Sequence, residues 1–154
     1  MENKQIVKFN MYEMEYIGNS VKSNLPIVPF NEKYYEQYKR IINDCFYEMR
    51  KELNIKPYEN HNYTLEELSE LKENTFLLLN GEEIISAVTC SENDIKRVVV
   101  NLKYQRQGYG RKIMLFAVNY LQNRGSIPIK LTVTKWNENA IILYKSQAIF
   151  RISH

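Results

Sequence analysis

Residues 98–112 contain glycine, arginine and lysine residues at the point where a predicted strand passes directly into a predicted helix. The stretch begins with three consecutive valines, which are typical of a buried strand, and apolar residues recur at helical spacing after its two glycines. Backbone N–H groups in the first turn of a helix lack partners, and the helix dipole adds positive potential there. Glycine lets a bulky anion approach this backbone because it has no Cβ. The stretch therefore predicts a binding site for a phosphate-bearing ligand.

Two common phosphate-binding loops do not fit this stretch. The dinucleotide pattern G-x-G-x-x-G would need glycine at position 113, where the chain has Ile113, and the P-loop pattern does not occur. We expect a pyrophosphate to be held by the backbone and side chains around the two glycines, with Lys103 adding charge nearby. These residues are Arg106, Gly108, Gly110, Arg111 and Lys112.

Residues 105–110 (QRQGYG) match the pattern [QR]-x-x-G-x-[GA], the acetyl-CoA signature of the GNAT superfamily of N-acetyltransferases, which the chain resembles. Residues 131–144 (LTVTKWNENAIILY) are similar to the family's segment L-x-V-x-x-x-N-x-x-A-x-x-L-Y at every fixed position. The two motifs follow each other at the family's spacing and element order. The resemblance extends over roughly residues 25–149.

The resemblance implies acetyl-CoA as cofactor, with coenzyme A as product. It places pantetheine along the strand of Val98, Val99 and Val100, bonded to backbone groups of the first and last. The first motif places Gln105, Gln107 and Tyr109 at the cofactor, and the second motif places Asn137, Ala140 and Tyr144 there. Tyr144 is expected beside the sulfur as general acid. A phenol suits that role because it keeps its proton at neutral pH.

The family's reaction is a direct attack by an amine, which needs no enzyme nucleophile. The acceptor ammonium must first lose a proton, through a carboxylate or an ordered water. Glu92 and Asp94 are the carboxylates nearest to the active strand in sequence, and both are candidates for this base. Four residues are candidates for lining an acceptor pocket. They are Tyr47, Tyr58, His61 and Tyr63.

Length and composition predict one ordinary globular domain over residues 1–154, with residues 1–24 as an N-terminal strand extension. Hydrophobic residues make up 44% of the chain and charged residues 25%. The net charge of +3 is too small to argue for nucleic acid. Two cysteines without a C-x-x-C pattern indicate no metal site and favour reduced thiols in the cytoplasm. We expect no membrane-spanning segment.

The hydrophobic pattern predicts a strand at 25–30, a helix capped by Asn31 that ends near residue 53, and a short helix over 64–72 opened by a capping box. Three strands follow, with Asn80-Gly81 joining the first two as a hairpin. Gly125 ends the next helix. The remaining expected elements are strands at 75–79, 83–89, 95–100 and 129–134, a helix from 109 to 124, a helix after 137 and an apolar segment at 148–150. Residues 6–9 and 14–17 predict an N-terminal hairpin or edge strand.

These elements predict an α/β fold of the GNAT type. We expect a mixed, mostly antiparallel sheet with a splayed central parallel pair, flanked by helices. Two departures from the family stand out: Ala148-Ile149 replace the usual Gly-Phe, and the chain stops at His154 where the family adds a further strand. A short or missing C-terminal strand leaves an edge to be covered by a second copy or by the N-terminal segment.

The leading hypothesis is an N-acetyltransferase that acts on a primary amine of a small molecule or peptide. The alternative is a non-catalytic acyl-CoA-binding or sensing domain. A third reading, nucleic-acid binding through the basic loop, predicts a steeply salt-dependent affinity that the small net charge does not favour. No motif in the sequence fixes which amine is acetylated.

Overall fold

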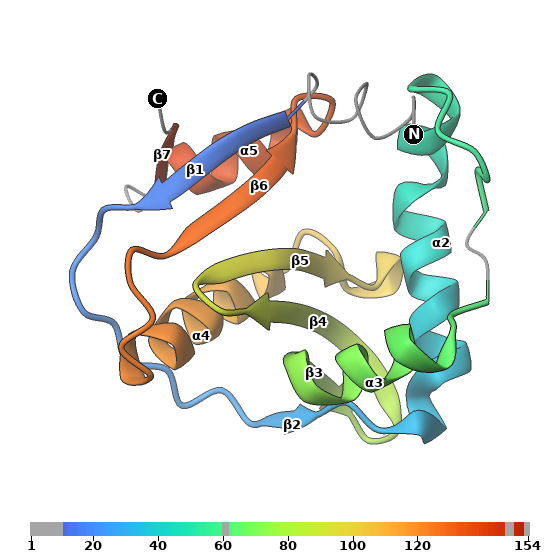
Figure 1. Ribbon diagram of the computed structural model, residues 1–154, viewed down its shortest axis with the longest axis horizontal. Coiled ribbons are helices and arrows are strands. Elements are labelled where there is room, and N and C mark those ends of the chain that lie inside the picture. The colour runs from blue at the N-terminus through green and yellow to red at the C-terminus, as the bar shows by residue number, and fades with distance from the viewer. Residues whose placement is uncertain (1–10, 60–61, 147–149, 153–154) are drawn as a thin grey trace.

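The computed structural model describes residues 11–59, 62–146 and 150–152, and its strands form one mixed sheet with helices on both faces (Figure 1). The strands are β1 (Met11–Tyr16), β2 (Ile27–Pro29), β3 (Thr75–Asn80), β4 (Glu83–Ser91), β5 (Asp94–Val100), β6 (Lys130–Thr134) and β7 (Phe150–Ile152). Their order across the sheet is β2-β3-β4-β5-β6-β1-β7. The fold class is the expected one.

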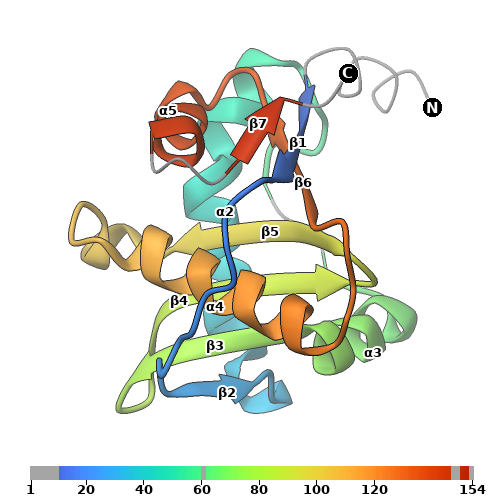
Figure 2. The same ribbon diagram turned by 90° about the vertical axis from the view of Figure 1, so that its left-hand side faces the viewer.

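The helices divide into two layers (Figure 2). They are η1 (Glu32–Tyr34), α2 (Tyr35–Glu52), α3 (Leu65–Asn74), η2 (Leu102–Tyr104), α4 (Tyr109–Asn123) and α5 (Glu138–Ser146). Helices α2 and α3 bury one apolar cluster against the sheet, and α4 and α5 bury a second cluster on the opposite face. Any site on this sheet therefore faces either the α2 side or the α4 side.

Local sequence signals fix the ends of several elements. Thr64 and Glu67 form the expected capping box at the start of α3. Asn80 pairs with Glu83 across the β3–β4 hairpin, with Gly81 at φ +62°. Gly125, at φ +68°, ends α4 as expected, with its own N–H and the next one bonded back to carbonyls of the last helical turn.

The parallel pair is short. Strands β5 and β6 pair only at Asp94–Lys130 and Ile95–Leu131, and the rest of β5 runs antiparallel to β4. Figure 1 shows the two strands diverging beyond that point. The predicted splay of the central pair is confirmed.

A β-bulge at Lys96 lies at the point of divergence. On β4, consecutive residues Thr89 and Cys90 pair with Arg97 and Ile95, so Lys96 is the extra residue. A bulge bends its strand and reverses which face the following side chains occupy. Ile95 accordingly packs in the α4-side cluster, whereas Val99 packs in the α2-side cluster.

The sequence predicts an N-terminal hairpin or an edge strand. In the structure the N-terminal strand is not at an edge of the sheet. Strand β1 lies between β6 and β7 and runs antiparallel to both, with five residue pairs to β6 and three to β7. The part of that prediction that concerned residues 6–9 falls outside the described residues. The chain's own N-terminal segment thus covers the edge of β6, one of the two coverings expected. Strand β7 is short, also as expected.

Met14 anchors β1 to the α4-side core and gives a test of this arrangement. Its side chain is 0% exposed within that cluster. We expect Met14→Ala to lower the free energy of unfolding by about 3 kcal/mol, because it leaves a cavity that the core cannot fill. Ile17→Ala is the control, since Ile17 follows the same strand but is 51% exposed. Equal losses in urea denaturation would mean that β1 does not dock here.

Candidate active site

A groove of about 600 Å³ lies on the α4 side, between β5, the N-terminus of α4 and α5. Most of the predicted cofactor residues line it, and Leu143 joins them. The lining residues are Val98, Val100, Gln105, Arg106, Gly108, Tyr109, Gly110, Arg111, Asn137, Ala140, Leu143 and Tyr144. Three predicted residues do not line it: Gln107 and Lys112 are exposed beside the loop, and the Val99 side chain is buried on the α2 side.

The N-terminus of α4 is open to an anion. Gly108 is the N-cap at φ +87°, no side chain caps the helix, and no acidic residue lies in its first turn. The N–H groups of the first turn consequently have no partner within the helix. Arg106, at φ +64°, and Arg111 are exposed beside it. Lys103 instead pairs with Glu83 at 3.1 Å, away from the groove.

The backbone of β5 presents Val98 and Val100 to the gap between β5 and β6. The Asn101 N–H donates to Ile85 O on β4 at 2.9 Å, which makes Val100–Ser86 a non-hydrogen-bonded pair. The N–H and C=O of Val98 and Val100 therefore point away from β4. On that side Val100 O accepts from Gln105 Nε2 at 3.0 Å and from Cys45 Sγ at 3.3 Å.

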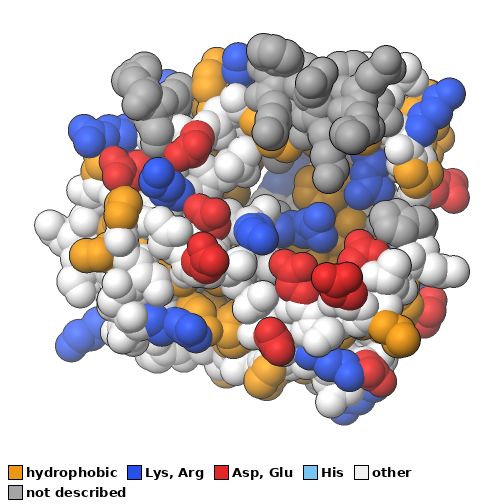
Figure 3. Space-filling view, in the orientation of Figure 1, with side chains coloured by type: hydrophobic (Ala, Val, Ile, Leu, Met, Phe, Trp, Pro, Cys, Tyr) orange, Lys and Arg blue, Asp and Glu red, His pale blue; other side chains and the backbone are white. Residues whose placement is uncertain are grey.

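A second cavity, of about 200 Å³, lies on the α2 side of the same gap, and we call it the acceptor pocket. It shares Val98, Asn137 and Tyr144 with the groove, so the two meet between β5 and β6. Its other lining residues are Met11, Phe46, Met49, Arg50, Lys96, Arg97, Thr132, Val133 and Thr134. Figure 3 shows Lys and Arg side chains in the hollowed centre of this face.

Tyr144 sits where the two cavities meet. It is 8% exposed, and its ring packs 5.9 Å from that of Phe150. Burial raises the pKa of Tyr144 from 10.0 to about 12, so its phenol stays protonated at neutral pH. Asn137, at the start of the same helix, accepts from the Ala140 N–H at 3.2 Å through its side chain. The cap sets the direction in which α5 delivers the phenol.

The structure does not bring the two candidate bases to the site. Glu92, at φ +55°, and Asp94 lie in and after the β4–β5 turn, at the end of β5 opposite to Val100. Neither lines the groove or the acceptor pocket. Within the described ranges, neither cavity is lined by a carboxylate or a histidine.

The four residues predicted to line an acceptor pocket lie in different places. Tyr63 lies beside Arg97, and its ring packs against that of Tyr35 at 5.6 Å. Tyr47 lies beside Lys51, and the Tyr58 hydroxyl donates to Asn54 at 3.0 Å beyond the end of α2. Neither lines the acceptor pocket. His61 falls outside the described residues.

Sequence reasoning missed the two arginines of the acceptor pocket. Arg50 continues the helical stripe of Phe46 and Met49, and this charged residue on an otherwise apolar face was the available signal. Arg97 faces the α2 side only because of the bulge at Lys96, which no sequence pattern reveals.

Among the residues that the structure describes, no helix is long and apolar enough to cross a membrane. These residues also contain no group of three or more His, Cys, Asp or Glu side chains placed to hold a metal ion.

A family model described as the acetyltransferase (GNAT) family matches residues 35–148. Among solved structures, a transcriptional regulator from Bacillus halodurans C-125 is 21% identical with a TM-score of 0.66, over 83% of this chain and 93% of that one. The PaiA N-acetyltransferase from Thermoplasma acidophilum, in complex with coenzyme A, is 13% identical with a TM-score of 0.56, over 79% and 86%. Arabidopsis thaliana Naa50, with the bisubstrate analogue CoA-Ac-MVNAL, is 19% identical with a TM-score of 0.51, over 79% and 80%. The comparison with curated proteins gave no match.

The raised pKa of Tyr144 predicts a pH dependence of stability. The folded state holds this proton more tightly than the unfolded state, so the stabilisation is full below pH 10.0 and is lost as pH rises through about 12. From about pH 9 to about pH 11 the wild type should lose about 1 kcal/mol more than Tyr144→Phe. Urea denaturation of both proteins across this range measures the difference. Parallel pH curves would place the phenol in water rather than in the protein interior.

Proposed function

The chain belongs to the acetyltransferase (GNAT) family, and we propose that it is an acetyl-CoA-dependent N-acetyltransferase acting on a primary amine of a small molecule or peptide. One observation carries the proposal. The groove with the open helix N-terminus and the acceptor pocket meet at the gap between β5 and β6, and Tyr144 lines both.

The groove fits the parts of coenzyme A in order. The N–H groups at the start of α4 would hold its pyrophosphate, with Arg106 and Arg111 alongside. The backbone groups of Val98 and Val100 along the gap would bond to pantetheine as to an added strand. Acetyl-CoA supplies the activated acetyl group as a thioester.

The chemistry is a direct transfer between the two cavities. The acceptor ammonium releases a proton to water, its nitrogen bonds to the acetyl carbon, and the C–S bond breaks. Tyr144 gives its proton to the departing sulfur and regains one from the nitrogen. The products are an amide, coenzyme A as the free thiol and one proton. A β5 backbone N–H can stabilise the oxyanion formed on the way.

The alternative is a non-catalytic acyl-CoA sensor of the same fold. A sensor needs the groove but has no use for a second cavity that reaches the same phenol, so the acceptor pocket favours the enzyme. We place the enzyme in the cytoplasm, because Cys45 and Cys90 are both free thiols, as a reducing compartment keeps them.

Acetyl-CoA at about one hundred times its dissociation constant should stabilise the protein by about 2.7 kcal/mol. Gly108→Ala should lose most of this increment, because alanine at φ +87° resists the loop conformation and its Cβ points into open space beside the groove. Gly81→Ala is matched, at φ +62° with equally open surroundings but in the β3–β4 hairpin. Thermal unfolding with and without acetyl-CoA measures both.

We expect both glycine variants to lose similar intrinsic stability, whereas Gly81→Ala keeps the acetyl-CoA increment. No increment in the wild type would contradict the proposed cofactor. Equal loss of the increment in the two variants would remove Gly108 from the binding site.

Tyr144→Phe should lower kcat roughly 100-fold, the usual scale for losing a general acid, while leaving acetyl-CoA affinity unchanged. Free-thiol release with a turned-over amine measures kcat, and the acetyl-CoA increment in thermal unfolding measures affinity. Phenylalanine keeps the ring packing against Phe150, so a folding defect does not mimic the result. An unchanged kcat would show that another group protonates the sulfur.

A further inference from the structure

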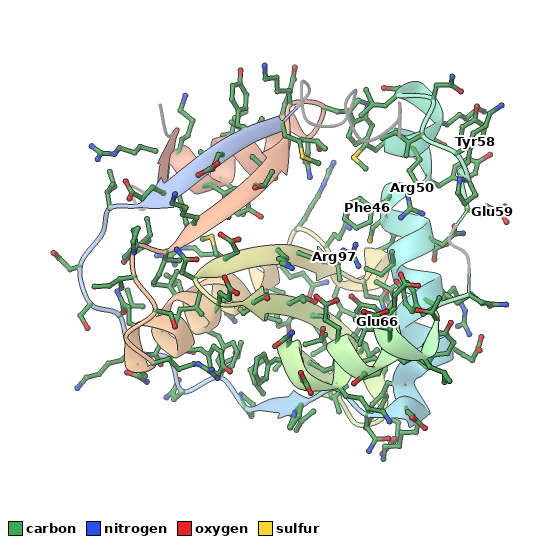
Figure 4. All side chains as sticks on the ribbon, in the orientation of Figure 1. Phe46, Arg50, Tyr58, Glu59, Glu66 and Arg97 are labelled. Atoms are coloured by element: carbon green, nitrogen blue, oxygen red, sulfur yellow. The ribbon has the colours of Figure 1, made fainter. Side chains whose placement is uncertain are left out.

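The acceptor pocket carries positive charge at its α2 side. Arg50, on α2, and Arg97, on β5, come from facing elements and both line it, as Figure 4 shows with labels. Both are partly buried. Two guanidinium groups brought together away from bulk water repel each other, and such an arrangement is costly unless an anion compensates it.

The pKa of Arg50 reports the same crowding, whereas the pKa of Arg97 reports its bonds to tyrosines. Burial lowers the pKa of Arg50, and the positive charge of Arg97 lowers it further, against an opposing effect of Tyr63. For Arg97, burial acts to lower the pKa, but the electrostatic effects of Tyr38 and Tyr63 and the bonds to their hydroxyl groups raise it overall. Both stay protonated at neutral pH, because a guanidinium ordinarily titrates far above it.

No carboxylate of the described residues forms an ion pair with either arginine. The acidic residues that share an adjoining cavity with Arg97 are engaged elsewhere. Glu70 pairs with Lys96 at 3.6 Å, and Glu67 accepts from the Thr64 N–H in the capping box. The third cation of the pocket thus has a carboxylate partner, whereas among the described residues the two arginines have no carboxylate partner, and Arg97 is bonded only to neutral hydroxyl groups.

The rest of the pocket is small, and its lining combines apolar and polar side chains. Its volume of about 200 Å³ lies below the roughly 300–1,000 Å³ of sites that take drug-sized ligands. Phe46, Met49 and Val133 supply apolar walls. The pocket therefore fits a molecule of amino-acid size with one anionic group and an apolar body.

We propose that the acceptor is a small amine that carries a carboxylate, which Arg50 and Arg97 hold while the amine points to the gap beside Tyr144. This inference rests on the proposed N-acetyltransferase function. Arginine suits the task, because its planar fork donates paired N–H bonds to a carboxylate. The substrate class follows: amino acids and similar amino carboxylates, in preference to their amides and to diamines.

The test compares matched amines in a free-thiol release assay with acetyl-CoA. Leucine and methionine are each paired with their carboxamide, and 1,4-diaminobutane and O-phosphoethanolamine are added as a dication and a phosphate. For wild type, kcat/KM for each amino acid should exceed that of its amide by roughly 10- to 100-fold, the scale of a charge-assisted hydrogen bond. A preference for the amides or the diamine overturns the inference, and a preference for the phosphate overturns the carboxylate.

Arg50→Gln and Arg97→Gln should each lower kcat/KM for the amino acids roughly 10- to 100-fold, mainly through KM, and leave the amides unchanged. Arg50→Lys should retain part of the preference for amino acids over their amides, since lysine keeps the positive charge but lacks the paired N–H donors of the guanidinium group. Arg40→Gln is the control, because Arg40 is on the same helix but outside the acceptor pocket. Equal losses for amino acid and amide in the arginine variants would contradict carboxylate recognition.

A binding measurement covers the case in which no panel amine is turned over. The leucine analogue 4-methylpentanoate, which lacks the amine, should raise the unfolding temperature of the coenzyme A complex of wild type but not of Arg50→Gln. No rise in wild type overturns the inference. The stabilisation by acetyl-CoA, and its loss in Gly108→Ala, do not depend on this pocket. These measurements therefore distinguish failure of the inference from failure of the proposed function.

Discussion

The parting of β5 from β6 is the constraint on which the rest of the structure depends. Two residue pairs hold the strands together, and the bulge at Lys96 then bends β5 away while its pairing with β4 continues. The parting leaves the backbone groups of Val98 and Val100 facing a gap instead of a strand. Backbone groups need partners, and the side chains of Gln105 and Cys45 supply them for Val100 O. A ligand that can bond as a strand does can supply them for the other groups along the gap. The same bulge turns Arg97 to the α2 side, so one distortion shapes both cavities.

A strand that parts from its neighbour must be held from its other side. Strand β6 has two residue pairs with β5 but five with β1, which is paired in turn with β7. The N-terminal strand therefore keeps β6 in the sheet and α5, which follows β6, in position. Because Tyr144 is on α5, the place of the phenol depends on a segment more than a hundred residues earlier in the sequence. The N-terminal segment is thus part of the machinery that positions the site.

The sequence predicts those parts of the site that local chemistry determines. The turn from β5 into α4, the uncapped helix start at Gly108 and the Asn137 cap each follow from residue types within a few positions, and the structure has all three. The predicted hairpin, capping box and helix end at Gly125 succeed for the same reason. The placement of β1 between β6 and β7 could not be predicted this way, because pairing between distant strands depends on which edges the finished sheet leaves open. Arg97 was missed because strict alternation along β5 breaks at a bulge that carries no sequence signal.

The absence of a carboxylate from the described lining of both cavities bears on how the amine loses its proton. A carboxylate beside an ammonium raises the pKa of that ammonium and keeps the nitrogen protonated, whereas nearby positive charge lowers it. Arg50 and Arg97 therefore favour the neutral amine that the attack requires, and ordered water can carry the proton away. A carboxylate on the substrate pairs with the guanidinium groups, so their positive charge offsets its tendency to raise the pKa of the amine. The arginines that select such a substrate would in this way also replace part of the work of a dedicated base.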